Sequence, residues 1–357
     1  DFYYTPPTGY LALCTKNLPD VDVTPSEHFN TVLYTGNGST KSITGVNFQP
    51  DFTWIKNRPS GNDYHNIYDS VRGTLKRIYS NGTNPEEVGH LTSFDSDGFS
   101  LNTSNSNVNG NGTSYVAWNW KANGSGSSNT NGSINTTATS ANVDSGFSII
   151  AYSGNGTSGA TIGHGLSKAP EFFTVKRRSS GGDDWETYYG DNTDFLRLNS
   201  NAATSDNAAM WNDTSPSNSL ITLGNHAEVN SSGETYICYA WHSVDGYSKV
   251  GSYTGNANAD GPFVYTGFRP AYVMIKNTTL GSWHIFDSTR EPTNDGSMFD
   301  LRADSQGAEL TQTTNDRWEA VSNGFKMRGT NNESNGNGQT VVYIAFAETP
   351  FKYSNAR

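Results

Sequence analysis

Short apolar stretches alternate along the chain with clusters of Asn, Gly, Ser and Thr. The apolar stretches are rich in Val, Ile, Tyr, Phe and Trp, which favour strands, and the Asn-Gly or Gly-Asn pairs between them favour tight turns. Residues 71–79 and 201–211 have a helix-compatible composition, but either segment suits only one or two turns. The pattern therefore predicts an all-β fold of short antiparallel strands.

One arrangement of residues recurs three times. Each copy contains Tyr-x-Gly-Asn, then a Pro, an apolar strand and a Lys six residues after the Pro, and it closes on an aromatic strand. We interpret the prolines as strand starts and the lysines as equivalent ends of one core strand. The tyrosines are Tyr34, Tyr152 and Tyr253, and the Pro and Lys pairs are Pro50 and Lys56, Pro170 and Lys176, and Pro270 and Lys276.

The repeats divide the chain into units of about 100 residues, each long enough for its own core. We expect three tandem antiparallel β-sandwich-like domains at residues 29–122, 145–245 and 246–357. Residues 1–28 predict an extended lead-in from an upstream domain. Residues 123–144 are rich in Asn, Gly, Ser and Thr and predict a linker, in which an edge strand is an open alternative.

The first and third units share a second motif, Asp-Ser-x-Arg. It places Asp69 close to Arg72 and Asp287 close to Arg290, whereas the middle unit has Trp-Glu-Thr-Tyr-Tyr at 185–189 instead. We interpret each Asp and Arg as a local structural ion pair, worth less than about 1 kcal/mol if it is exposed.

The same motif suggests partners for two of the repeated lysines. Lys56 precedes Asp69 by 13 residues and Lys276 precedes Asp287 by 11, which is the reach of a strand, a turn and a return strand. We therefore expect each of these lysines to approach its aspartate, and Lys176 to pair elsewhere or to be exposed.

Composition excludes several classes of protein. Of the 357 residues, 33% are hydrophobic, 12% aromatic and 16% charged, which excludes a globally disordered chain. The formal net charge of −11, without any Lys- or Arg-rich run, argues against a nucleic acid as partner. No apolar run approaches the roughly 18 residues of a membrane-spanning helix, so we expect no membrane insertion.

Motifs of common catalytic and cofactor sites are missing. There is no Gly-x-Ser-x-Gly elbow in a useful context and no Gly-x-x-x-x-Gly-Lys loop, and the seven histidines lack metal-ligand spacing. We expect no enzyme activity and no cofactor, although acidic loops leave a glycosidase-type carboxylate pair open. Asp95 and Asp97 are weak calcium candidates, because the rest of an EF-hand loop is absent.

Four tryptophans are candidates for glycan or receptor binding. They lie outside the strongest strand patterns and close to Asp and Asn residues, and aromatic faces beside polar groups suit sugar recognition, although a core position is the competing interpretation. These residues are Trp185, Trp211, Trp283 and Trp318.

Several motifs together resemble a known but uncharacterised repeat domain. They include Gly45-Val-Asn-Phe-Gln-Pro-Asp-Phe-Thr-Trp-Ile-Lys56, Tyr68-Asp-Ser-Val-Arg-Gly73, Tyr115-Val-Ala-Trp-Asn-Trp-Lys121 and, in the second unit, Ile162-Gly-His-Gly-Leu166. We associate this domain with tail-fibre and virion-appendage proteins of marine tailed bacteriophages. The resemblance covers nearly the whole chain and brings no catalytic residues.

The resemblance implies a structural and adhesive component of a virion, located on an extracellular appendage. Its partners would be other virion proteins and a host cell-surface glycan or receptor. Two alternatives remain open: a glycan depolymerase on the same scaffold, and a bacterial surface adhesin or carbohydrate-binding module without a virus.

The chain is also expected to form a homo-oligomer, most simply a parallel trimer. Separate β domains leave sheet edges and flexible junctions, which packing against two further chains would cover. On this hypothesis Trp120 and Phe351 are exposed in an isolated chain and buried between chains in the assembly.

Overall fold

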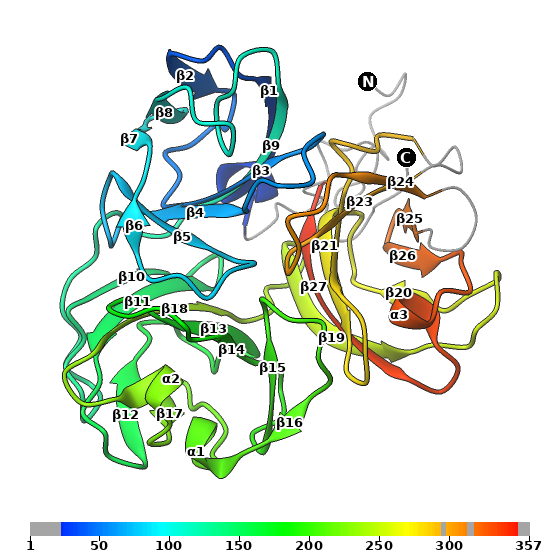
Figure 1. Ribbon diagram of the computed structural model, residues 1–357. Helices are drawn as coiled ribbons and strands as arrows, with labels where there is room; N and C mark the ends of the chain where they lie inside the picture. Colours follow the sequence, from blue (N-terminus) through cyan, green and yellow to red (C-terminus); the bar gives the residue numbers. More distant parts are fainter. Residues whose placement is uncertain (1–22, 294–297, 313–317, 349–357) are drawn as a thin grey trace, which may run out of the picture.

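The computed structural model describes residues 23–293, 298–312 and 318–348, and it confirms the all-β fold (Figure 1). Three antiparallel units follow one another, which we call repeats 1, 2 and 3, and each has one large and one small sheet. The described helices are short: a 3-10 turn at Pro25–Glu27, α1 (Ala208–Trp211), α2 (Ala227–Asn230) and α3 (Asn332–Asn335). Of the two helix-compatible segments, 201–211 contains α1 and 71–79 contains a strand.

Repeat 1 has a large sheet with the strand order β1-β9-β3-β4-β5-β6 and a small sheet with the order β2-β8-β7. Its strands are β1 (Phe29–Thr35), β2 (Thr40–Thr44), β3 (Phe52–Asn57), β4 (Asn66–Asp69), β5 (Lys76–Tyr79), β6 (Glu87–Val88), β7 (Leu91–Asp95), β8 (Gly98–Asn102) and β9 (Ser114–Trp120).

Repeat 2 has the orders β10-β11-β18-β13-β14-β15-β16 and β12-β17. Its strands are β10 (Ala138–Asn142), β11 (Phe147–Ser153), β12 (Ala160–Gly163), β13 (Phe172–Arg177), β14 (Trp185–Tyr188), β15 (Asp194–Arg197), β16 (Ser205–Asp206), β17 (Leu220–Leu223) and β18 (Thr235–Trp241).

Repeat 3 has the orders β19-β27-β21-β22-β23-β24 and β20-β26-β25, the same arrangement as repeat 1. Its strands are β19 (Ser248–Thr254), β20 (Phe263–Tyr265), β21 (Pro270–Asn277), β22 (Trp283–Asp287), β23 (Met298–Arg302), β24 (Leu310–Gln312), β25 (Trp318–Val321), β26 (Gly324–Met327) and β27 (Thr340–Ala347).

The three repeated lysines occupy one register, as the spacing predicts. In each repeat the lysine lies on the strand that pairs with the last strand of the repeat. Lys56 faces Val116, Lys176 faces Ile237 and Lys276 faces Val342.

The expected approach of Lys56 to Asp69, and of Lys276 to Asp287, is wrong. The β3–β4 register puts Asp69 opposite Phe52, four residues before Lys56, and four residues of strand span about 13 Å. Lys56 Nζ instead donates to the carbonyl oxygen of Asp63 at 2.7 Å, in the loop that joins the two strands.

The other two lysines bind loop carbonyl groups in the same way. Lys176 donates to the carbonyl oxygen of Asp183, and Lys276 to that of Gly281. Burial lowers the pKa of each of the three lysines to about 8. The recurring lysine is thus a buried cap of a hairpin loop.

The segment 123–144 is part of the folded body. Its strand β10 pairs with β11 along the edge of the large sheet of repeat 2. Ser140 is fully buried, and its hydroxyl accepts a hydrogen bond from the N–H of Asn123 at 2.8 Å. The Asn- and Ser-rich composition therefore supplies hydrogen-bonding groups to a sheet edge.

The central strands of the large sheets are buried on both faces. Almost every residue of β3, β18 and β27 is buried. One face packs on the small sheet of its own repeat, and the other packs on the two neighbouring repeats. Burial on both faces explains why β18 and β27 have continuous apolar and aromatic runs instead of an alternating pattern.

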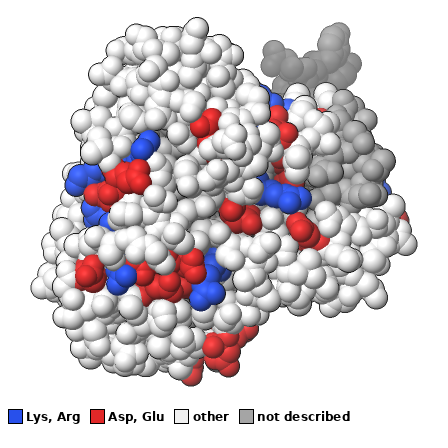
Figure 2. Space-filling view, viewed as in Figure 1, with Lys and Arg blue, Asp and Glu red and all other residues white. Residues whose placement is uncertain are grey.

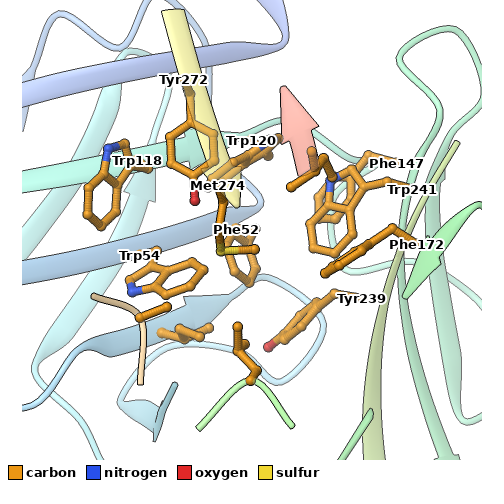
Figure 3. Packing of buried hydrophobic residues seen from close by; sticks show 14 of the residues in the cluster. Phe52, Trp54, Trp118, Trp120, Phe147, Phe172, Tyr239, Trp241, Tyr272 and Met274 are labelled. Atoms are coloured by element: carbon orange, nitrogen blue, oxygen red, sulfur yellow. The ribbon is translucent and has the colours of Figure 1, made fainter. Parts of the chain in front are cut away.

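One aromatic core joins the three repeats (Figure 3). The ring centres of Phe52 in repeat 1 and Tyr239 in repeat 2 lie 4.6 Å apart, and those of Trp118 in repeat 1 and Tyr272 in repeat 3 lie 5.8 Å apart. The cavity in this core, lined by residues of all three repeats such as Phe52, Trp241 and Tyr272, measures about 20 Å³, which leaves room for at most one water molecule. The three repeats thus form one body around a pseudo-threefold centre, as Figure 1 shows.

The expected exposure of Trp120 in an isolated chain is wrong. Only 2% of its surface is accessible, because Trp241 of repeat 2 and Phe346 of repeat 3 cover it, with ring centres at 6.4 and 5.4 Å. Phe351 lies outside the described residues. The chain itself supplies the threefold packing that the sequence suggested for three separate chains.

Candidate functional site

Repeat 1 holds repeat 2 through a buried polar cluster. Asp69 is fully buried and accepts hydrogen bonds from the backbone N–H of Arg72 at 2.7 Å, from the Arg72 guanidinium, and from the Tyr239 hydroxyl at 2.6 Å. Burial opposes the charge on Arg72, but its partners, Asp69 first among them, raise the pKa of Arg72 above its ordinary value. The local ion pair expected from Asp-Ser-x-Arg is present, but it is buried and reaches the next repeat.

A second ion pair lies at the rim of the same junction. Glu86 of repeat 1 accepts two hydrogen bonds from Arg178 of repeat 2, at 2.9 and 3.1 Å. Arg72 Nη1 lies 3.5 Å from Glu86 and links the buried cluster to the rim. We call the Asp, Arg and Glu of one repeat, here Asp69, Arg72 and Glu86, its clamp on the next repeat.

Repeat 3 holds repeat 1 with the same clamp. Asp287 pairs with Arg290 and accepts a hydrogen bond from the Trp118 indole N–H at 3.0 Å. Glu309 accepts a two-point ion pair from Arg58, with a shortest distance of 2.7 Å. The clamp motif therefore recurs because it joins neighbouring repeats around the centre.

Repeat 2 has no such clamp on repeat 3. By strand register Tyr189 takes the place of Asp69, and Ile344 takes the place of Tyr239. At the rim Thr204 and Thr278 replace the Glu and Arg, joined by a backbone hydrogen bond of 2.9 Å. A tyrosine, an isoleucine and a backbone contact occupy the positions where the other two junctions have ion pairs.

The unclamped junction contains an open cleft of about 590 Å³. At the equivalent place between repeats 3 and 1 the pocket measures about 190 Å³. Between repeats 1 and 2 the connecting segment fills that place: the Ala122 N–H donates to Asp51 at 2.8 Å, and the Ser70 hydroxyl donates to the Gly124 carbonyl at 2.6 Å. The three junctions thus share one geometry, and one of them is open.

The walls of this cleft come from repeat 2 and from β19 and β27 of repeat 3. The side chains that define its chemistry are two tyrosines, two carboxylates and three Ser or Thr hydroxyls, namely Tyr188, Tyr189, Glu171, Asp191, Ser215, Ser252 and Thr340. Their mixture of aromatic, acidic and hydroxyl groups suits a polar ligand that also has an apolar face.

Hydrogen bonds fix the two carboxylates of the cleft. The backbone N–H and the hydroxyl of Thr193 donate to Asp191 at 3.0 and 2.8 Å and lower its pKa, so Asp191 is ionised at neutral pH. The Ser243 N–H donates to Glu171 at 2.5 Å. Burial and the nearby Glu171 carboxylate raise the pKa of Tyr343 to about 12, so this phenol stays a neutral donor.

The four tryptophans proposed for glycan binding are all buried. Trp185 donates its indole N–H to the Tyr79 carbonyl of repeat 1 at 2.8 Å, and Trp283 donates to the Arg197 carbonyl of repeat 2 at 2.8 Å. Trp211 and Trp318 pack inside the sandwich cores of repeats 2 and 3. A sugar cannot stack on these rings in this structure, and the binding role assigned to them is corrected to a structural one.

The weak calcium candidates serve the protein's own backbone and side chains. Asp97 accepts hydrogen bonds from the N–H groups of Asn47 and Gly45 at 2.6 and 3.1 Å, and Asp95 accepts one from the Ser100 hydroxyl at 2.7 Å. These bonds stabilise the turn between β2 and β3 and the β7–β8 hairpin.

Three other carboxylates, Asp184, Glu186 and Glu228, converge within 4.8 Å in repeat 2. Arg197 lies 2.9 Å from Asp184 and 3.3 Å from Glu186. Burial and Glu228 raise the pKa of Glu186 to about 9, so the pair holds a proton at neutral pH. That proton and Arg197 offset the negative charge without a metal ion.

An exposed aromatic pair lies on the small sheet of repeat 3, and sequence reasoning missed it. Phe263 and Tyr265 are 49% and 64% exposed, and the equivalent register in repeat 1 carries Ser42 and Thr44. The signal was available, because the small sheets of the two repeats share Asp97-Gly-Phe and Asn323-Gly-Phe starts and can be aligned.

Figure 2 shows that on the face it draws, charged side chains gather in a few clusters, most of them of mixed sign, and leave most of the surface uncharged. Among the described residues no helix has both the length and the apolar character needed to cross a bilayer.

No curated protein matches the chain. A family model described as "Domain of unknown function (DUF7483)" matches residues 24–350, which include all three repeats in a single match. The chain therefore belongs to the DUF7483 family, whose function is unknown.

Proposed function

We propose that this protein is a structural and adhesive component of a virion appendage, and that it contacts a host cell-surface glycan or receptor through the cleft between repeats 2 and 3. The observation that carries the proposal is the open, acidic and aromatic cleft at the one junction that lacks a clamp. The equivalent place is filled by the connecting segment between repeats 1 and 2 and is a smaller pocket of about 190 Å³ between repeats 3 and 1, so the fold does not require an opening of this size.

The rest of the molecule suits display outside a cell. Its three repeats form one body with a shared core, and its surface is largely uncharged on the face of Figure 2. Contacts made by uncharged polar groups and rings persist in salt water, where screening weakens exposed charge pairs. The resemblance to phage appendage domains supports the same assignment.

A homotrimer remains a prediction. The burial of Trp120 removes one physical argument for it, so the resemblance is now its main support. Light scattering of the purified chain tests it directly: we expect three times the chain mass, and a stable single-chain species would overturn it.

Binding is tested by narrowing the cleft. Ser252 is an exposed residue of the edge strand β19, so Ser252→Arg places a long side chain in the cleft without disturbing a core. Leu33→Arg is the matched control, because Leu33 holds the same register in repeat 1 and is 42% exposed. We expect fluorescently labelled chain to bind bacterial cells, Ser252→Arg to lose this binding and Leu33→Arg to keep it. Equal binding by the two variants would contradict the proposed site.

The virion location needs a second experiment. Immunogold labelling of purified phage particles with an antibody to the chain is expected to mark an appendage. Cell binding by a chain that no particle carries would favour the alternative of a bacterial surface adhesin.

The two carboxylates of the cleft support the alternative of a glycan depolymerase. Glu171 and Asp191 are acidic groups in one pocket, and glycosidases use such pairs. Release of reducing sugar ends from a polysaccharide, abolished in Asp191→Asn, would establish that activity. Binding without turnover is the result expected of an adhesin.

A further inference from the structure

We infer that the cleft between repeats 2 and 3 selects uncharged saccharides and rejects acidic ones. This inference rests on the proposed function, because it assigns the chemical class of glycan to the same cleft.

The charge of the cleft sets its selectivity. Glu171 and Asp191 both line it, and none of the described lining residues is Lys or Arg. Asp191 stays ionised because Thr193 holds it with two hydrogen bonds. A sialic acid, uronic acid, sulfate or phosphate group would therefore meet like charge and no Lys or Arg among the residues that line the cleft, and such juxtapositions act against the wrong partner.

The clamp arginines of the other two junctions have no counterpart at this cleft. At the other two junctions the rim carboxylates, Glu86 and Glu309, are paired with Arg178 and Arg58. At the junction of repeats 2 and 3 the arginine position is Thr278, so the rim supplies no guanidinium to balance the acidic cleft. The missing clamp accompanies the open cleft, and Glu171 and Asp191 give the cleft its negative charge.

The remaining groups match a sugar. Carboxylate oxygens accept hydrogen bonds from hydroxyls, and charge-assisted bonds of this kind are among the stronger ones in proteins. Ser215, Ser252 and Thr340 add hydroxyls that both donate and accept. Tyr189 is half-buried and offers an aromatic surface for the C–H face of a sugar ring.

The volume limits the ligand to a short saccharide. About 590 Å³ lies within the roughly 300–1,000 Å³ range of small-molecule pockets. One or two sugar rings fit such a space, and a longer chain would extend into solvent. The site therefore fits a terminal or short neutral saccharide unit.

A glycan array tests the class. The probe set pairs neutral oligosaccharides with their sialylated, sulfated and uronic acid counterparts, and the wild-type chain is applied with Ser252→Arg, Leu33→Arg and Asp191→Asn. We expect the wild type and Leu33→Arg to bind neutral glycans only. Ser252→Arg should lose binding, and Asp191→Asn should bind about tenfold more weakly, which is the effect of losing one charge-assisted hydrogen bond.

The outcomes separate this inference from the proposed function. Preference for acidic glycans, abolished in Ser252→Arg, would overturn the inference and leave the adhesive role intact. Binding to cells that depends on the cleft, with no glycan bound on the array, would also overturn the inference alone. Absence of binding to both cells and glycans would overturn both. Circular dichroism of each variant shows whether a loss of binding reflects a loss of fold.

Discussion

The hydrogen bond between Asp69 of repeat 1 and Tyr239 of repeat 2 lets us predict how strongly these two repeats are coupled. The Tyr239 hydroxyl donates to Asp69 at 2.6 Å, and Asp69 is fully buried beside Arg72. The perturbation is a double-mutant cycle of Asp69→Asn and Tyr239→Phe, which keeps the shapes of both side chains.

The structure gives the size of each effect. Tyr239→Phe removes a hydrogen bond to a charged group and is expected to lower the free energy of unfolding by roughly 1.5–3 kcal/mol. Asp69→Asn leaves the buried Arg72 without its main counter-charge and should cost roughly 3–5 kcal/mol. Once Asp69 is uncharged, Tyr239→Phe removes only a neutral hydrogen bond, worth about 0.5–1.5 kcal/mol. The loss of unfolding free energy in the double variant should therefore be smaller, by about 1 kcal/mol or more, than the sum of the losses in the two single variants.

Urea denaturation provides the assay, followed by tryptophan fluorescence and by circular dichroism. Coincident transitions by the two probes justify a single free energy of unfolding for each variant. Asp287→Asn with Trp118→Phe is the equivalent cycle at the junction of repeats 3 and 1 and should show similar coupling. Tyr189→Phe with Ile344→Val, at the unclamped junction, should show almost none.

The effects of substitutions at independent sites add to within about 0.5 kcal/mol. A coupling energy smaller than this in the double-mutant cycles at both clamped junctions would therefore refute the reasoning.

Three further predictions concern the core, the pH response and the connecting segment. Trp120→Ala removes a side chain that all three repeats share and should cost roughly 3–5 kcal/mol in urea denaturation, and a loss below 1 kcal/mol would contradict the shared core. Glu186 keeps its proton in the folded state up to about pH 9 but releases it near pH 4.3 when unfolded. The free energy of unfolding of the wild type should therefore fall as the pH rises from about 4.3 to about 9. Relative to the wild type, Glu186→Gln should become more stable over this pH range by on the order of a few kcal/mol. A constant difference between the two proteins at pH 5, 7 and 9 would contradict the shared proton. Limited proteolysis, read by mass spectrometry, should leave residues 123–142 intact because β10 is bound into a sheet, and early cleavage there would contradict this.

The sequence predicted much of the fold inside each repeat. The Pro and Lys spacing located one core strand three times, and Lys56, Lys176 and Lys276 lie in equivalent registers. Lysine partners were predicted wrongly, because spacing gives the reach of a hairpin but not its register. The long loop between Asn57 and Asn66 shifts Asp69 to the far end of the hairpin.

The arrangement between repeats could not be predicted in the same way. Contacts such as that of Asp287 with Trp118 join residues 169 positions apart, and no local pattern specifies them. The useful signal was a difference between copies: the middle unit lacks Asp-Ser-x-Arg and has Tyr189 there. That absence marks the open junction, whereas the tryptophans singled out for their position are packing residues.

A ring made from three covalently joined copies has freedoms that a ring of three identical chains lacks. A substitution in a homotrimer changes every interface at once, whereas a substitution here changes one junction and leaves two clamps in place to keep the ring closed. The copies can therefore specialise, two for holding the ring together and one for presenting an opening. Under the proposed function the consequence is monovalency: the described residues form one such cleft between repeats 2 and 3, so firm attachment to a surface would require many chains side by side, where multivalent binding raises effective affinity by roughly 10²–10⁴.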